Sequence, residues 1–187
     1  MVEAGRGHWP FALVHGEPLV AAAAWALGEA GVELVDVGTP WAAFAEAELP
    51  FVLHDPLCPL TPPEFLAACV AHAEATSAVT VGVRPVTDTV RELADGPIDG
   101  PFGGPFGGPF GDTVDRAGLL QVVSPIVLPA AVVAALDGPP TTDFAGLVAE
   151  LATKFPVQTL EAPAQARRVA DHDDLRVLEA LTAPLPG

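Results

Sequence analysis

The dipeptide His54-Asp55 stands directly after the apolar run LPFVL at residues 49–53, which predicts a strand buried on both faces. Ligands of an α/β sheet bind beyond the carboxyl ends of its strands. The Asp55 carboxylate could therefore hydrogen-bond a sugar hydroxyl, or bind a metal that accompanies a nucleotide phosphate. The competing interpretation is a strand-end aspartate that caps the turn ahead of Pro56, and spacing alone favours that structural role.

Two other short segments carry side chains that could bind a phosphorylated ligand. The TDT motif at residues 87–89 follows the predicted strand at 78–83, although Thr and Asp also form ordinary turns through local backbone hydrogen bonds. The pair Arg167-Arg168 precedes the last predicted helix, where two guanidinium groups could clamp a phosphate or pair with neighbouring acidic side chains. Taken alone, the TDT motif is better explained as a turn than as a ligand site. The arginine pair could be either a phosphate clamp or a surface pair bound to acidic neighbours.

A glycine-rich segment near the start of the sequence is the candidate for a nucleotide-binding loop. Gly5-Arg6-Gly7 has the composition of a phosphate loop, but a GxG motif of this length is weak evidence. A frayed terminus is the competing interpretation.

Two other kinds of site are excluded by residue spacing. Cys58 and Cys69 are the only cysteines, which are too few for a structural zinc site, so no metal ligand is predicted. Ser77 and Ser124 are the only serines, and neither stands in a GxSxG elbow, which excludes the hydrolase triad built on that motif.

The composition predicts a protein of the cytoplasm with a real hydrophobic core. Of 187 residues, 50% are hydrophobic and 17% are charged, so global disorder is excluded. Acidic residues outnumber basic ones 24 to 8, and the net charge of -16 argues against binding to nucleic acid or to an anionic membrane surface. No signal peptide is predicted, and the low-charge stretch at residues 18–27 is too short to span a bilayer.

Helical and strand patterns alternate along the chain, which predicts a mainly parallel α/β sheet. Helices are predicted at residues 17–30, 41–48, 61–75, 129–136, 143–154 and 171–181, and strands at 32–37, 49–53, 78–83, 119–123 and 156–160. The helix at 61–75 is expected to start with a capping box, TPPE, and the terminal helix at 171–181 is also expected to be capped.

Residues 86–116 interrupt this alternation. An extended stretch at 87–93 and a possible return strand at 112–115 predict a β-arm inserted in a single domain that spans residues 1–187. Between them, PFGG is repeated with small changes from residue 101 to 112. A short perfect repeat of Pro and Gly is typical of a tolerant loop, so we expect it to form the tip of the arm.

Four segments share their order and spacing with one enzyme family. They are FVLHDPLCPLTPPEFL (51–66), VGVRPVTDTVREL (81–93), GDTVDRAGLLQVVSP (111–125) and ARRVADHDDLRVLEAL (166–181). They match the family's HDAARP turn, its PVTDT segment, its TVDR and QTP segments, and its closing NIKIT segment with the helix after it. The chain thereby resembles the 2-C-methyl-D-erythritol 4-phosphate cytidylyltransferase family of isoprenoid biosynthesis.

This resemblance implies a Rossmann-like nucleotidyltransferase sheet, mainly parallel, with a protruding β-arm that makes a homodimer. It also implies a small phosphorylated ligand, and a nucleoside triphosphate with Mg²⁺ if the chain is active. In the family the arm reaches the active site of the other subunit, so the arginine of TVDR would contact the substrate phosphate there. The implied substrate-binding residues are Asp55, Thr87, Asp88, Arg116, Ser124 and Arg168, and the implied nucleotide-binding residues are Gly5, Arg6 and Gly7.

The glycine-rich loop departs from the family pattern GxGxRxGxxxPK. No arginine falls on the arginine position, and Phe11 takes the place of the lysine. The missing charges would stabilise the transition state for attack on the α-phosphate, so we expect activity to be reduced or lost. Two alternatives stay open: a noncatalytic dimeric ligand-binding or regulatory module, which needs no cofactor, and a transferase for a different nucleotide or sugar phosphate.

Overall fold

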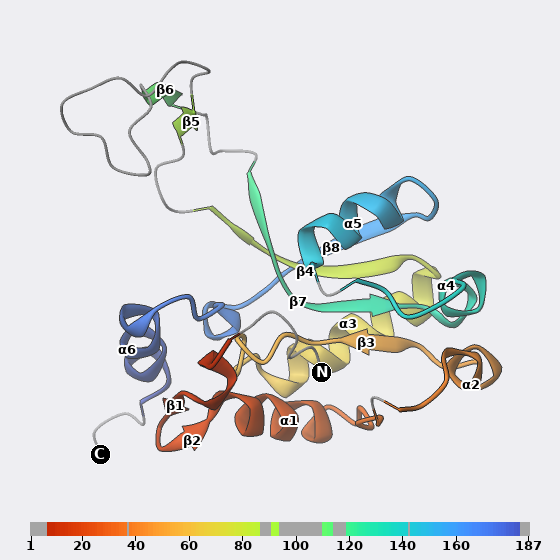
Figure 1. Cartoon of the computed structure of the whole chain (residues 1–187), viewed down its shortest axis with the longest axis horizontal. Helices are drawn as coiled ribbons and strands as arrows, with labels where there is room; N and C mark the ends of the chain where they lie inside the picture. Colours follow the sequence, from red (N-terminus) through yellow and green to blue (C-terminus); the bar gives the residue numbers. More distant parts are fainter. Residues whose placement is uncertain are drawn as a thin grey trace. The chain divides into compact units, whose positions relative to one another are not determined.

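The computed structural model describes residues 7–36, 38–86, 91–93, 110–113, 119–141 and 143–183 (Figure 1). The chain divides into two compact units. Met1–Arg84 and Val122–Gly187 make up the larger one, and Pro85–Gln121 the smaller one, which encloses the predicted arm at 86–116.

A four-stranded sheet runs through the larger unit in the order β3-β7-β4-β8. Its members are β3 (Phe51–Leu53), β4 (Val79–Pro85), β7 (Leu120–Leu128) and β8 (Val157–Glu161). Strands β4 and β8 are parallel, whereas β3 and β7 are antiparallel, with Leu53 opposite Ile126.

The α/β class is confirmed, but the sheet is mixed, and the expectation of a mainly parallel sheet is corrected at β3–β7. A parallel connection needs a crossover, which is usually a helix. Among its described residues, the stretch between β4 and β7 holds two short strands and no helix. The alternation of helical and strand patterns therefore predicted the wrong strand direction after the arm, which stands where a parallel connection would have a crossover helix.

Six α-helices occur in the described part of the chain. They are α1 (Leu19–Glu29), α2 (Trp41–Glu46), α3 (Pro63–Thr76), α4 (Ala130–Ala135), α5 (Phe144–Ala152) and α6 (His172–Thr182), close to the predicted ranges. Helix α1 packs beside α3, and α5 packs on β8 (Figure 1). None of the helices in these ranges is both long enough and apolar enough to cross a membrane.

The largest hydrophobic core lies between the sheet and α5. Val79 and Val81 of β4 and Ile126 of β7 are fully buried there, and Leu147 and Leu151 of α5 pack against them. Full burial of an aliphatic side chain contributes about 1.5–3 kcal/mol. This core therefore holds β4 and β7 in place, and the polar residues of these strands with them.

Two predicted helix starts have different outcomes. At α6 the prediction is confirmed, since the Asp171 carboxylate accepts hydrogen bonds from the backbone N–H groups of Asp173 and Asp174, both at 2.9 Å. At α3 the capping box is wrong. The Thr61 hydroxyl donates instead to the Cys58 carbonyl at 2.8 Å, because proline residues hold the start of this helix and Thr61 lies outside it.

The predicted strand at residues 32–37 is wrong for its described residues. Positions 32–36 form no strand, and Leu34 and Val35 are exposed, because no neighbouring strand pairs with them. The frayed terminus considered for Gly5-Arg6-Gly7 falls mostly outside the described residues, which begin at Gly7. A 3-10 helix η1 (Trp9–Phe11) precedes a small hairpin of β1 (Leu13–Val14) and β2 (Glu17–Pro18).

In the smaller unit, β5 (Arg91–Leu93) pairs antiparallel with β6 (Phe110–Thr113). This pair agrees with an outgoing and a returning strand in the predicted arm. Residues 94–109, which include most of the PFGG repeat, lie outside the described residues.

Replacing Gly82 with alanine should destabilise the fold by about 2 kcal/mol, since a group forced into a packed interior displaces its neighbours. An added Cβ on Gly82 would lie 2.9 Å from the Ser124 carbonyl oxygen and 3.1 Å from its carbon, both in the neighbouring strand. Gly28 of α1 is the matched control, because a Cβ there would meet nothing within 4 Å. Gly28→Ala should stabilise by about 0.5–1 kcal/mol. Urea denaturation measures both, and equal midpoints for the two variants would contradict the close packing at Gly82.

Candidate functional site

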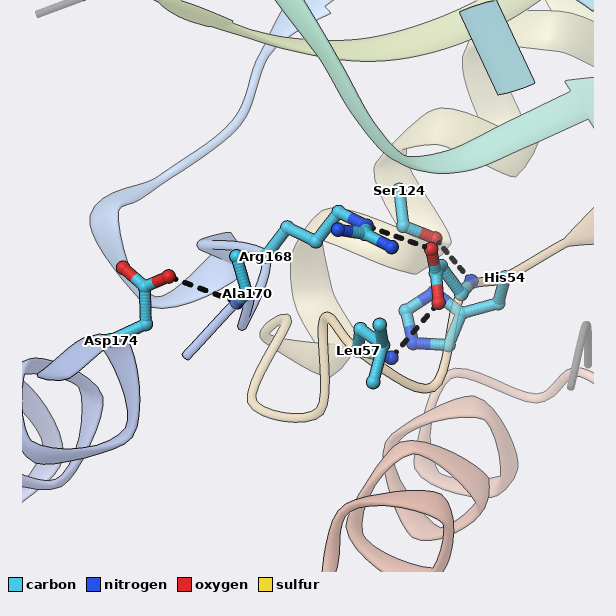
Figure 2. Close-up of polar contacts among 7 residues, drawn as sticks. His54, Leu57, Ser124, Arg168, Ala170 and Asp174 are labelled. Atoms are coloured by element: carbon cyan, nitrogen blue, oxygen red, sulfur yellow. Dashed lines mark hydrogen bonds and ion pairs between the residues drawn. The ribbon is translucent and has the colours of Figure 1, made fainter. Parts of the chain in front are cut away.

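Asp55 lies two residues beyond β3, and both of its carboxylate oxygens are engaged. Oδ1 accepts a hydrogen bond from the Leu57 backbone N–H at 3.0 Å, and Oδ2 lies 3.2 Å from Nε of Arg168 (Figure 2). The Asp55 side chain is only 4% exposed. The aspartate therefore does cap the turn after β3, and it also binds an arginine that is 113 residues away in sequence.

Ser124 of β7 connects this aspartate to the sheet. Its hydroxyl oxygen accepts a hydrogen bond from the Asp55 backbone N–H at 3.0 Å and lies 2.6 Å from Nδ1 of His54 (Figure 2). The Ser124 side chain is fully buried. In this arrangement its hydroxyl is used to hold the two residues that follow β3.

His54 is a neutral side chain in the interior. Burial lowers its pKa from 6.5 to about 4, and the nearby charge of Asp55 offsets only part of that effect. Nδ1 faces Ser124, whereas Nε2 has no hydrogen-bond partner in the described structure. A neutral imidazole suits this position because a buried charge would need a partner.

Arg168 presents the cationic group of the site. Its side chain is 35% exposed, and its Nε atom is the one that faces Asp55. The described structure gives its terminal nitrogens no further hydrogen bond or ion pair, so they can donate to an incoming anion. Asp55 thus holds the guanidinium from one side and leaves its outer edge available.

Arg167 turns in another direction from Arg168. Its Nη1 atom lies 3.6 Å from Oδ1 of Asp174 on α6. The other oxygen of Asp174 accepts a hydrogen bond from the Ala170 backbone N–H at 2.9 Å (Figure 2). The pairing with an acidic neighbour is therefore present for Arg167. Arg167 and Arg168 therefore pair with different aspartates, and these contacts do not direct both side chains toward one phosphate.

The other predicted site residues are placed as follows. Gly7 is described, is exposed and has a positive φ of 60°. Outside the described residues lie Gly5, Arg6, Thr87, Asp88 and Arg116. The structure therefore brings together Asp55, Ser124 and Arg168, three of the six residues predicted to bind substrate.

The segment that follows Gly7 carries aromatic groups where the resemblance leads one to look for cations. Residues 7–18 contain neither lysine nor arginine. Trp9 packs edge-on against the His172 ring with centroids 5.1 Å apart, and Phe11 is 66% exposed. The Trp9 contact packs η1 against the start of α6, and neither aromatic side chain offers a positive charge.

Two features of the site were missed at the level of sequence. His54 was noted only as a neighbour of Asp55, although a histidine directly after a buried strand signals a buried polar group. Arg84, at the end of β4, donates from Nη1 to the Ala164 carbonyl at 2.7 Å. The sequence signal for Arg84 is its position as a single cation directly after the apolar run AVTVGV.

Across the residues that the structure describes, no group of three or more His, Cys, Asp and Glu side chains is arranged to hold a metal ion. The Arg168 guanidinium and the Leu57 backbone N–H donate to the Asp55 carboxylate, whereas the Ser124 hydroxyl accepts from the Asp55 backbone N–H.

Known structures share this fold. A 2-C-methyl-D-erythritol 4-phosphate cytidylyltransferase from Thermus thermophilus superposes with a TM-score of 0.61 at 24% identity, covering 94% of each chain. A 4-diphosphocytidyl-2C-methyl-D-erythritol synthase superposes with a TM-score of 0.63 at 18% identity, covering 92% of this chain and 94% of that one. No protein-family model matches the chain.

A curated relative gives the sequence comparison. The 2-C-methyl-D-erythritol 4-phosphate cytidylyltransferase of Frankia casuarinae is 36% identical over 138 residues, which cover 71% of this chain and 46% of that protein. The chain thus matches a little under half of the length of this relative.

Fold and comparisons together define the class, an α/β protein with the nucleotidyltransferase fold. Within that class, the chain resembles the 2-C-methyl-D-erythritol 4-phosphate cytidylyltransferases, and the resemblance inferred from the four sequence segments is confirmed.

Proposed function

We propose that this chain is a cytidylyltransferase-like protein that binds 2-C-methyl-D-erythritol 4-phosphate or a closely similar phosphorylated polyol, and whose nucleotidyl-transfer activity is reduced or lost. The observation that carries the proposal is the pairing of Asp55 with Arg168. Asp55 and Arg168 are the two charged residues among the described ones that the resemblance implies to bind substrate.

The substrate half of the proposal follows from the chemistry of this pair. A guanidinium group with its terminal nitrogens available is suited to phosphate oxygens, which accept paired N–H donors. The Asp55 carboxylate fixes the orientation of that guanidinium and supplies an acceptor next to it. We propose that Thr87, Asp88 and Arg116 complete the site, with Arg116 contributed by a second copy of the chain.

The nucleotide half is proposed to be weakened because residues 7–18 hold no cation. Phosphoryl transfer depends on positive groups that neutralise charge as it develops on the phosphate oxygens. Phe11 is exposed to solvent and cannot supply such a group. We propose that any remaining transfer requires Mg²⁺ bound to the triphosphate.

Titration calorimetry with 2-C-methyl-D-erythritol 4-phosphate tests the substrate half. We expect binding that weakens about tenfold or more in Arg168→Gln, since a hydrogen bond to a charged group is lost. Arg176→Gln is the matched control, because Arg176 is an exposed arginine on α6 whose ion pair in the described part of the chain is with Asp173. Equal affinity in wild type and Arg168→Gln, or no heat at millimolar ligand, would reject the binding site.

We also propose a homodimer formed through the arm. An isolated two-stranded β-structure is marginally stable in water, so β5 and β6 gain stability from a partner surface. Light scattering at micromolar concentration should give twice the chain mass. Deletion of residues 101–108 should leave the dimer intact, whereas a monomer in the wild-type protein would contradict the proposal.

A further inference from the structure

Ser124 is one of the predicted substrate-binding residues, but its hydroxyl is enclosed by the protein. The residue is 0% exposed in β7. Its oxygen accepts a hydrogen bond from the Asp55 backbone N–H at 3.0 Å and lies 2.6 Å from Nδ1 of His54 (Figure 2). A ligand that reached this oxygen would have to break into these two contacts. The position of Ser124 therefore favours an indirect role over a direct contact with a ligand.

The two contacts together assign the hydrogen of the Ser124 hydroxyl. The Asp55 N–H can only donate, so it uses a lone pair of the hydroxyl oxygen. The one hydroxyl hydrogen is then left for Nδ1 of His54, which accepts it in a neutral imidazole. His54 is neutral at neutral pH because burial lowers its pKa to about 4. One hydroxyl thereby ties strand β7 to both of the residues that follow β3.

The turn that follows β3 holds Arg168 through two routes. Through the side chain, the Nε–H of Arg168 donates to Oδ2 of Asp55 at 3.2 Å. Through the backbone, Leu57 donates its N–H to Oδ1 of Asp55 at 3.0 Å, and its carbonyl accepts from the Val169 N–H at 2.7 Å. Leu57 and Val169 are both buried in one hydrophobic cluster. The direction of the Arg168 side chain therefore depends on where this turn lies.

We propose that Ser124 is a positioning residue, which together with His54 fixes the Asp55 turn and thereby the direction in which Arg168 presents its terminal nitrogens to a phosphoryl group. An arginine side chain has many rotamers, and ordering it on binding costs affinity. An arginine that a fixed carboxylate already holds loses less freedom when the anion arrives. The effect on affinity rests on the proposed substrate site, whereas the orientation of Arg168 is measurable without a ligand.

Ser124→Ala removes the hydroxyl, so the Asp55 N–H and Nδ1 of His54 lose their shared partner. Titration calorimetry with 2-C-methyl-D-erythritol 4-phosphate should show an affinity about threefold to tenfold lower, the effect of one neutral hydrogen bond. Ser124→Thr keeps a hydroxyl on the same carbon and should restore most of the affinity. Thr80→Val is the matched control, because the Thr80 hydroxyl is also buried, in the neighbouring strand β4, and donates to the Ala78 carbonyl.

Nitrogen-15 NMR of the ligand-free full chain separates positioning from direct contact with a ligand. In Ser124→Ala the Asp55 amide signal and the Arg168 Nε–H signal should both shift, and the Arg168 Nε–H should exchange faster with water. In Thr80→Val both signals should keep their wild-type positions. A serine that only touched the ligand would leave the Arg168 signal of the ligand-free protein unchanged.

His54 offers a second pair of variants that leaves Ser124 intact, for the case in which Ser124→Ala fails to fold. His54→Leu removes the acceptor at Nδ1, so the Ser124 hydroxyl loses its partner and the Arg168 signal should shift. His54→Asn can place its amide oxygen near the position of Nδ1. In this variant the Arg168 signal should stay close to that of the wild type.

Two results would overturn the inference. One is an Arg168 Nε–H signal that is the same in wild type, Ser124→Ala and His54→Leu. The other is a signal that shifts as much in Thr80→Val as in Ser124→Ala, which would indicate a general loosening of the sheet. A wild-type protein that does not bind the polyol phosphate would instead reject the proposed substrate site, and the ligand-free signals would still decide whether Ser124 positions Arg168.

Discussion

Cytidylyl transfer by this chain should be slower than about 0.1 per second, a hundredfold below the typical enzyme turnover of ~10 per second. The reason is the uncharged segment 7–18, in which Phe11 stands at the position of the expected lysine. Removal of one group that stabilises transition-state charge costs about 10²–10³ in rate, and here the arginine and the lysine of the loop are both absent. The measurement is pyrophosphate release with cytidine triphosphate, Mg²⁺ and 2-C-methyl-D-erythritol 4-phosphate.

Phe11→Lys tests whether the missing charge is the cause. Phe11 is 66% exposed, so the fold should accept the longer polar side chain. We expect the rate to rise by about tenfold, since one cation of the pair is restored. Trp25→Lys is the control, because Trp25 is similarly exposed, at 63%, on α1 and the substitution adds the same charge elsewhere. Wild-type turnover above about 0.1 per second in this assay would contradict the loss of activity.

Acidification should destabilise the fold through His54, by about 3 kcal/mol between pH 7 and pH 4. The pKa of His54 is about 4 in the folded chain and 6.5 in its ordinary state. Between these values the unfolded chain binds a proton that the folded chain does not, so stability falls as the pH falls. Above pH 6.5 the fold keeps all of the stability that depends on a neutral His54, and below pH 4 this stability is lost.

His54→Asn isolates this effect from the titration of other groups. Asparagine can place a polar atom near the position of Nδ1, which faces Ser124, and it does not titrate. The free energy of unfolding should therefore decline less steeply in the variant than in the wild type from pH 6.5 to pH 4. Urea denaturation at several pH values measures both curves. Parallel curves over this range would show that His54 does not titrate between these limits.

Much of the local structure was predictable because it depends on local interactions. The apolar run AVTVGV and the cap residue Asp171 predict β4 and the start of α6, and both are confirmed. The pattern at residues 32–37 failed because alternation alone does not provide a neighbouring strand. The same limit explains the sheet, where the direction of β7 depends on what connects it to β4.

Three properties of this protein follow from its amino-acid sequence alone: its acidic charge, the lack of lysine and arginine in residues 7–18, and the position of Asp55 after a buried strand. They depend on composition and on local order. The contact of Asp55 with Arg168, 113 residues away, and that of Ser124 with His54, 70 residues away, became visible only in the folded chain. Such contacts depend on strand register and on the packing of segments distant in sequence, which local propensities do not encode.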